Sequence, residues 1–205
     1  MRELSLHSML ALVIAVSALL YSCKDFTDVH FESNSGEADF STLAAAGNSL
    51  TAGFQSNALF ETAQRYSYPA LVAGQVESVH DFEQPLISNP GIGGRLQLDG
   101  AIPPMDPANM PAPAEGAGTP INADLGRPYN NLGIPGALSA DFLGQDLPGA
   151  SYDARRQNNP FFDIVLGDSG NTTQAEQLAQ LQPTFILFWH GNNDVLSYVT
   201  SGGTQ

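Results

Sequence analysis

Three short polar motifs that contain glycine stand out in this 205-residue chain, because their residue types can carry out acyl transfer. The motifs are GNSLTAG at 47–53, NLGIPG at 131–136 and GNND at 191–194. Ser49 follows an expected strand at a glycine-bearing turn, where a serine hydroxyl is held exposed as a nucleophile. Gly136 and Asn193 can offer a backbone N–H and a side-chain amide to an oxyanion. Together the motifs predict a hydrolase site.

Each of these residues also has a plain structural interpretation. Serine at a strand-to-helix junction is commonly a helix N-cap, so Ser49 fits that role as well. Gly136 suits an ordinary turn, and Asn193 suits a loop cap. Asp194 can cap a helix or hold its loop through the carboxylate. It is the combination of the three motifs in one order that favours a site.

The elements that position these motifs are expected to form an α/β fold. Residues 40–46 and 184–189 are apolar runs that end just before the first and third motifs. The second run is aromatic and branched without polar alternation, which predicts a strand buried on both faces of a parallel sheet. Open α/β sheets place their chemistry at the carboxyl ends of such strands.

Other segments predict the remaining elements. The apolar spacing predicts a helix over 51–75 that breaks or restarts at Pro69, and helices at 137–143 and 175–181. Residues 161–166 are interpreted as a strand. The segment 76–128 is rich in Pro and Gly, and we interpret it as a surface insertion beside the site without regular elements, rather than as a linker between two domains.

Composition limits the classes of partner. The hydrophobic fraction of 42% predicts one globular domain with its own core. The net charge of -14, with 7 Lys and Arg against 21 Asp and Glu, opposes binding to nucleic acid. The sequence contains no metal-ligand spacing and no phosphate-binding loop, so no cofactor is expected.

The N-terminus has the pattern of an export signal. Residues 1–22 contain an apolar run at 9–20 that is too short for a comfortable membrane span, and Cys23, the single cysteine, follows directly. The sequence LYSC at 20–23 resembles the lipobox of bacterial lipoproteins, which implies a lipid on Cys23; an ordinary cleaved signal or an unrelated cysteine are the alternatives. We expect a tether at 23–37, a domain at 38–205, and anchoring in the cell envelope at the outer membrane.

In this order, the three motifs resemble the first three blocks of the SGNH or GDSL hydrolase family, over about residues 40–198. The resemblance implies a flavodoxin-like three-layer α/β/α sandwich with a parallel sheet. It also implies a serine esterase or lipase-type acyl hydrolase that cleaves lipid, acylated-sugar or small esters. Ser49 would be the nucleophile, and the Ser49 N–H, the Gly136 N–H and the Asn193 side chain would be the oxyanion donors. Asn48 departs from the family's Asp but keeps a short polar side chain.

A larger departure concerns the acid and base. The family carries a late Asp-x-x-His block, and no histidine follows Asn193 in this chain. We therefore expect an N-terminal fragment of a longer hydrolase, with a sandwich incomplete at its C-terminus and little activity of its own. His190 is the tempting substitute base, but a histidine directly after a buried strand is more often structural. The alternative function is a non-catalytic surface lipoprotein that binds glycans or lipids with the same fold.

Two further patterns imitate catalytic motifs. The segment ESVH at 77–80 contains an acid and a base, but it precedes the second motif and is therefore out of the family's order. The segment GDSG at 167–170 contains a literal Gly-Asp-Ser, yet no helical apolar pattern follows it directly. We interpret residues 168–171 as a turn.

Overall fold

The computed structural model describes residues 36–97, 112–113, 116–167, 172–200 and 202–203. Within the chain, residues from Ala38 onward form one compact unit. The predicted signal peptide, Cys23 and nearly all of the tether lie outside the described residues, as do residues 168–171 of the predicted GDSG turn. None of the helices in the described ranges is long and apolar enough to cross a membrane. The same ranges contain no group of His, Cys, Asp and Glu that suits a metal ion.

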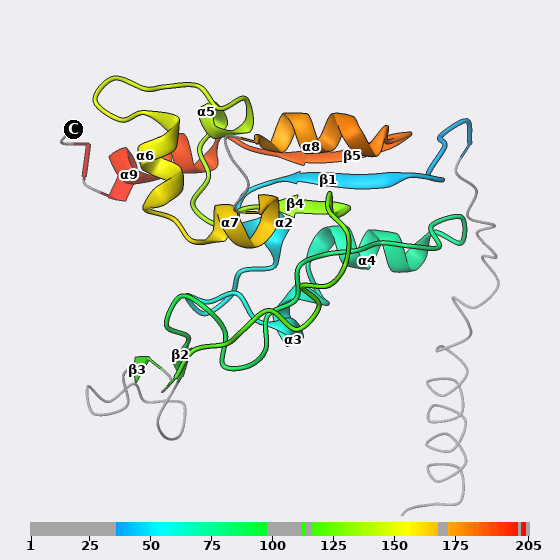
Figure 1. The fold of residues 1–205 in the computed structure, drawn as a ribbon, viewed down its shortest axis with the longest axis horizontal. Coiled ribbons are helices and arrows are strands. Elements are labelled where there is room, and N and C mark those ends of the chain that lie inside the picture. The colour runs from blue at the N-terminus through cyan, green and yellow to red at the C-terminus, as the bar shows by residue number, and fades with distance from the viewer. Residues whose placement is uncertain (1–35, 98–111, 114–115, 168–171, 201, 204–205) are drawn as a thin grey trace, which may run out of the picture. The chain divides into compact units, whose positions relative to one another are not determined.

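The centre of the fold is a sheet of three parallel strands (Figure 1). Strand β1 (Leu43–Gly47) lies between β4 (Asn131–Gly133) and β5 (Phe185–Trp189). In the register, Gly47 stands opposite both Gly133 and Trp189, so the three strands end at the same level. The prediction of an α/β protein with a parallel sheet is confirmed at this level of detail. The chain that follows each strand therefore emerges at one edge.

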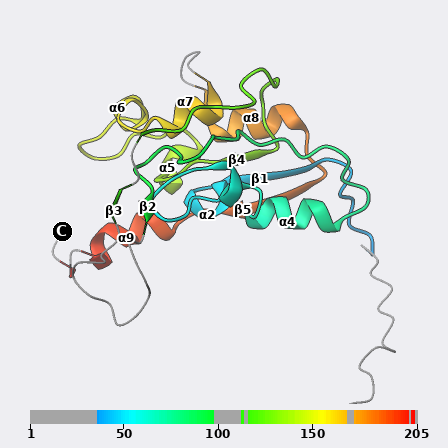
Figure 2. The same cartoon turned by 90° about the horizontal axis from the view of Figure 1, so that it is seen from below.

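Helices pack against this sheet. Ala44 and Ala46 of β1 contact a buried apolar cluster that includes Val165 of α7 (Phe161–Leu166) and Leu178 of α8 (Gln174–Leu181). Figures 1 and 2 show α8 on one side of the sheet and α4 (Tyr68–Gln75) on the other. The alanines of β1 are small, so the helices approach the central strand closely. The helix predicted at 175–181 is confirmed as α8.

The prediction of one helix over 51–75 that is interrupted only at Pro69 is wrong. The structure has three short helices there, α2 (Ser49–Ala52), α3 (Glu61–Gln64) and α4. Gly53 ends α2 in the left-handed conformation at φ +76°. The prediction that Pro69 restarts a helix is confirmed, since Pro69 lies in the first turn of α4, after the N-cap Ser67.

Residues 161–166 form a helix, so their interpretation as a strand is wrong. Phe162, Val165 and Leu166 of α7 are its buried residues, at the i, i+3, i+4 spacing of one helical face. A six-residue apolar run does not distinguish a strand from a buried helix by periodicity. The helix expected at 137–143 exists as α5 (Ser139–Phe142), and it is followed by α6 (Tyr152–Gln157). The last described helix is α9 (Asn192–Thr200).

The strand predicted at 184–189 is confirmed as β5, but the prediction that it is buried on both faces is wrong. Ile186, Phe188 and Trp189 keep about half of their surface exposed, at 46%, 54% and 49%. Over the described residues β5 pairs with β1 alone, which makes it an edge strand. The apolar residues of β5 are therefore not explained by packing against the other described residues.

Contrary to the prediction, the segment 76–128 does not lie wholly on the surface, and it is not free of regular elements. It contains two-residue antiparallel strands, β2 (Leu96–Gln97) and β3 (Ala112–Pro113). Ile87 is fully buried, and its backbone N–H donates to the side chain of Gln64 at 2.9 Å. This part of the segment belongs to the core of the domain, because its backbone groups are satisfied there.

Candidate functional site

The turn after β1 places Ser49 at the first position of α2. Asn48 is the N-cap, and its Oδ1 accepts a hydrogen bond from the Leu50 N–H at 3.4 Å. The interpretation of Ser49 as an N-cap is therefore wrong, because the preceding residue has that role. Within the described residues the Ser49 hydroxyl has no hydrogen-bond partner, and the residue is only partly buried. Its side chain is free to meet a ligand.

Two glycines allow α2 to lie directly against the sheet. A Cβ on Gly47 would come within 2.0 Å of Thr51 Oγ1 and 2.6 Å of the Trp189 carbonyl oxygen. A Cβ on Gly133 would lie 2.3 Å from the backbone nitrogen of Ala52. The glycines of the first two motifs are thus required by close approach of backbones.

Hydrogen bonds bring the three motifs together. Asn48 of the first motif donates from Nδ2 to Oδ1 of Asn192 in the third. Asn193 donates from Nδ2 to the carbonyl of Ala137, just after the second motif, at 2.9 Å. The Asp194 carboxylate accepts hydrogen bonds from the Ser139 backbone N–H and hydroxyl, each at 3.0 Å. Asp194 lies in the first turn of α9, and its carboxylate joins that helix to the start of α5, so it neither caps its own helix nor lies in a loop.

Gly136 occupies a turn in the left-handed region at φ +82°, where glycine is favoured. The preceding carbonyl, of Pro135, accepts a hydrogen bond from Asn159 Nδ2 at 2.8 Å, which fixes the orientation of the turn. In the described part of the chain, the backbone N–H groups of Gly136 and Ser49 have no acceptor. The Asn193 amide has two N–H donors and uses one on Ala137, so the other remains available.

His190 lies in an apolar setting beside the third motif. Its ring contacts Phe142 and Phe188, with centroid separations of 5.6 and 5.1 Å. Both ring nitrogens are buried, and neither has a hydrogen-bond partner among the described residues. Burial lowers the pKa of the His190 imidazole, against the opposing effect of the Asp194 and Asp141 carboxylates. No hydrogen bond joins His190 to Ser49 in the described structure, which supports the structural interpretation.

The other acid and base pattern is also remote from these contacts. Glu77 and His80 are both exposed, and neither forms a hydrogen bond with the three motifs in the described ranges. No hydrogen bond in the described ranges therefore links this acid and base pair to Ser49 or to the other motif residues.

Buried amides that the sequence did not single out hold the strand ends. Gln174, at the start of α8, is fully buried and donates from Nε2 to the carbonyls of Gly47 at 2.8 Å and Leu132 at 2.5 Å. Asn131 donates from Nδ2 to the Thr51 carbonyl at 2.9 Å. A glutamine at the start of an ordinary helix carries no local signal of this role, because its partners lie far away in sequence.

Two pockets adjoin the motifs. An apolar pocket of about 500 Å³ lies beside α2 and includes Leu50, Phe54 and Trp189. A second pocket, of about 440 Å³, lies beside Gly136 and is more polar, with Arg155 among its lining residues. Neither pocket was predicted from the sequence, since each combines segments that are distant along the chain.

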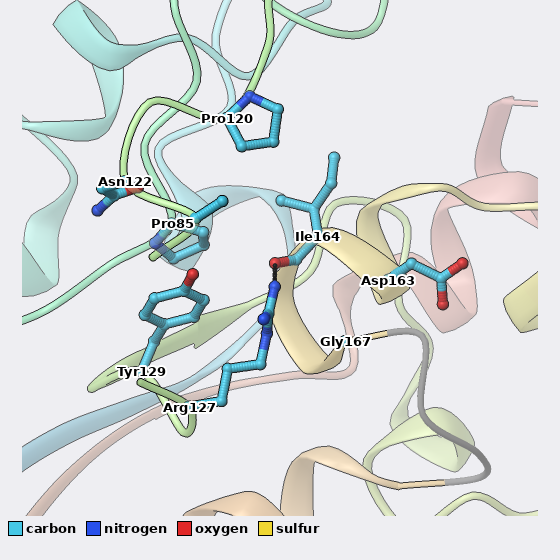
Figure 3. Close-up of a pocket in the computed structure, with 9 residues that line it drawn as sticks. Pro85, Pro120, Asn122, Arg127, Tyr129, Asp163, Ile164 and Gly167 are labelled. Atoms are coloured by element: carbon cyan, nitrogen blue, oxygen red, sulfur yellow. Dashed lines mark hydrogen bonds between the residues drawn. The ribbon is translucent and has the colours of Figure 1, made fainter. Parts of the chain in front are cut away.

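A third pocket, of about 360 Å³, lies near the start of β4 rather than at its end (Figure 3). Figure 3 shows the Arg127 side chain extending beside Tyr129 to the carbonyl of Ile164, to which it donates at 3.0 Å. Arg127 also donates to the Val165 carbonyl at 3.3 Å. The Arg127 guanidinium therefore binds carbonyl groups at the end of α7. This pocket lies at the edge of the sheet opposite to the one where the three motifs follow their strands.

Comparison of the chain with protein-family models, with curated proteins and with solved structures found no match. The function is therefore argued from the geometry of the three turns and the pockets around them.

Proposed function

We propose that the protein is a serine ester hydrolase of the SGNH type, in which Ser49 attacks the carbonyl carbon of a carboxylic ester. The observation that carries the proposal is the convergence of three turns at the ends of parallel strands. Asn48 is hydrogen-bonded to Asn192, and Asn193 to Ala137, so Ser49 belongs to one connected assembly with the second and third motifs. The finer fold that accompanies this proposal is the flavodoxin-like three-layer sandwich.

The proposed chemistry uses the donors around this assembly. As the Ser49 oxygen bonds to the carbonyl carbon, negative charge develops on the carbonyl oxygen. The N–H groups of Ser49 and Gly136, which have no acceptor in the described residues, and the second N–H of Asn193 are suited to stabilise that charge. The bond to the alcohol then breaks, the alcohol leaves with a proton, and water releases the acid from Ser49. No cofactor enters this scheme.

A general base is needed to take the proton from Ser49. The described residues offer no hydrogen-bonded histidine at that position, since His190 lies between Phe142 and Phe188. The resemblance assigns this role to a downstream Asp-x-x-His block. The assay therefore compares the gene product at its full length with the 205-residue chain.

The test is hydrolysis of p-nitrophenyl acetate and butyrate. The full-length protein should turn over both esters, and Ser49→Ala should lower kcat by at least about 10³-fold, as expected for loss of a nucleophile. Ser169→Ala is the matched control, because it removes the serine of the GDSG segment and should leave the rate unchanged. Turnover that survives Ser49→Ala would overturn the proposal.

A second candidate, a non-catalytic lipoprotein that binds lipids or glycans, is favoured by one observation. The Ser49 hydroxyl lacks a hydrogen-bonded base among the described residues. If the full-length protein is inactive on every acyl ester tried, the binding function replaces the esterase. In both cases we propose that a lipid on Cys23 anchors the protein in the envelope, which palmitate labelling of the parent and of Cys23→Ser would test.

A further inference from the structure

The apolar pocket beside α2 begins one residue after Ser49. Leu50 forms part of its wall, and Phe54, at the exit from α2, forms another part. Tyr66 comes from the chain between α3 and α4, Tyr68 is the first residue of α4, and Trp189 comes from the end of β5. The pocket is thus assembled from three separate segments around the turn that presents the serine.

Specific contacts place this pocket next to the turn. Trp189 stands opposite Gly47 in the register of β1 and β5. The Tyr68 hydroxyl lies 3.1 Å from Thr51 Oγ1, within hydrogen-bond distance, and its ring is 6.3 Å from that of Trp189. The pocket walls are therefore attached to the same short helix, α2, whose first residue is Ser49.

The chemistry of the lining indicates the kind of ligand. None of the residues that line the pocket carries a charged side chain, and Leu50, Phe54 and Trp189 present apolar surface. Leu50 and Trp189 are about half exposed, at 50% and 49%, so they have apolar area left to bury. The pocket beside Gly136 differs, because it contains the Arg155 and Asp141 ion pair at 2.7 Å. An uncharged chain gains most from the first pocket.

We propose that this pocket holds the aliphatic acyl chain of an ester whose carbonyl carbon lies at Ser49, so that the substrates are esters of medium-chain fatty acids rather than acetate. The inference rests on the proposed esterase function. A volume of about 500 Å³ lies within the range of pockets that bury small ligands. Each methylene that enters the pocket should improve binding by up to about fourfold, from the transfer of a methylene out of water.

The first experiment measures chain-length preference. For the full-length protein, kcat/KM on p-nitrophenyl esters should rise from the two-carbon to the eight-carbon acyl group. Tyr66→Ala removes an aromatic wall from a side chain that is 74% exposed, so it should flatten this rise without unfolding the protein. Tyr198→Ala, at an exposed aromatic residue of α9 outside the pocket, is the matched control and should keep the rise.

The second experiment does not depend on catalysis. Trp189 is the single tryptophan of the 205-residue sequence, so the tryptophan emission of that chain reports on this pocket, and the Ser49→Ala variant is measured in the 205-residue form. In the Ser49→Ala protein, 1-octanol should shift the emission to shorter wavelength as the half-exposed indole becomes covered. The affinity should fall by up to about fourfold per methylene through 1-hexanol and 1-butanol, and Tyr66→Ala should weaken it.

The two readouts separate failure of the inference from failure of the esterase function. Turnover that depends on Ser49, with no chain-length preference and no fluorescence response, overturns the acyl pocket and leaves the esterase intact. A fluorescence response in a protein that hydrolyses no ester overturns the assignment to an acyl chain of a substrate. Ser49-dependent turnover with a preference that Tyr66→Ala abolishes supports both.

Discussion

The replacement Gly133→Ala tests whether the close packing of α2 on β4 positions the serine. In the structure, a Cβ at this position would lie 2.3 Å from Ala52 N and 2.7 Å from the carbonyl carbon of Thr51. Ordinary van der Waals contact begins at 3.4 Å, so α2 must move away by about 1 Å. The opposing atoms belong to the backbone and cannot rotate aside. Overpacking costs about 1–3 kcal/mol in protein cores, and we expect the upper end of that range here.

Urea unfolding followed by circular dichroism measures this loss. Gly74→Ala is the matched control, because nothing lies within 4 Å of the added Cβ and the position is inside α4. That change should stabilise the protein by up to about 1 kcal/mol, the difference in helix propensity. Ser49 reactivity with an alkyl fluorophosphonate should fall by about 10²-fold in Gly133→Ala, since displacements of about 1 Å have that effect on aligned groups. An unfolding free energy within about 0.5 kcal/mol of the parent would refute the packing argument.

Three further changes follow from the hydrogen bonds and burial at the site. Asn48→Ala removes the N-cap of α2 and the bond to Asn192, so the unfolding free energy should fall by about 1–2 kcal/mol; an unchanged urea midpoint would contradict this. Gln174→Leu removes the buried donor that the carbonyls of Gly47 and Leu132 share, while Gly47 keeps the Ile134 N–H at 3.0 Å, so the unfolding free energy should fall by about 1–3 kcal/mol in the same assay. The lowered pKa of His190 means that the unfolded chain binds a proton more readily than the folded chain. Stability should therefore decrease as the pH falls below 6.5, and His190→Phe should reduce that slope in thermal melts.

The sequence predicted those elements whose signal is local. The apolar runs before the first and third motifs correspond to β1 and β5, and the apolar spacing at 175–181 predicted the confirmed helix α8. The failure at α7 has a clear cause, since its six apolar residues suit a strand and a buried helix equally. The exposure of β5 was not predictable, because burial depends on which neighbours a strand has.

The residues of the candidate site could be predicted from the sequence, but the contacts and pockets around them could not. Apolar runs followed by glycine-bearing motifs predicted the positions of Ser49 and Asn193 after strands, and Gly136 was predicted from its motif alone. The amide of Gln174 and the walls of the apolar pocket were missed, because their partners come from distant segments. Tyr66 and Tyr68 line the pocket although α3 separates them from Ser49 along the chain.

The bond between Asn48 and Asn192 has a consequence for the order of events during synthesis. The two residues are 144 positions apart, and the bond from Gln174 to Gly47 spans 127. On a ribosome that adds about 5–20 residues per second, the partners of the N-terminal turn are synthesised about 6–30 s after it. Until α8 and the third motif have been synthesised, the Gly47 carbonyl lacks its hydrogen bond from Gln174, and the Asn48 side chain lacks its hydrogen bond to Asn192. The serine turn is therefore among the first parts of the domain to be made and among the last to take its final shape.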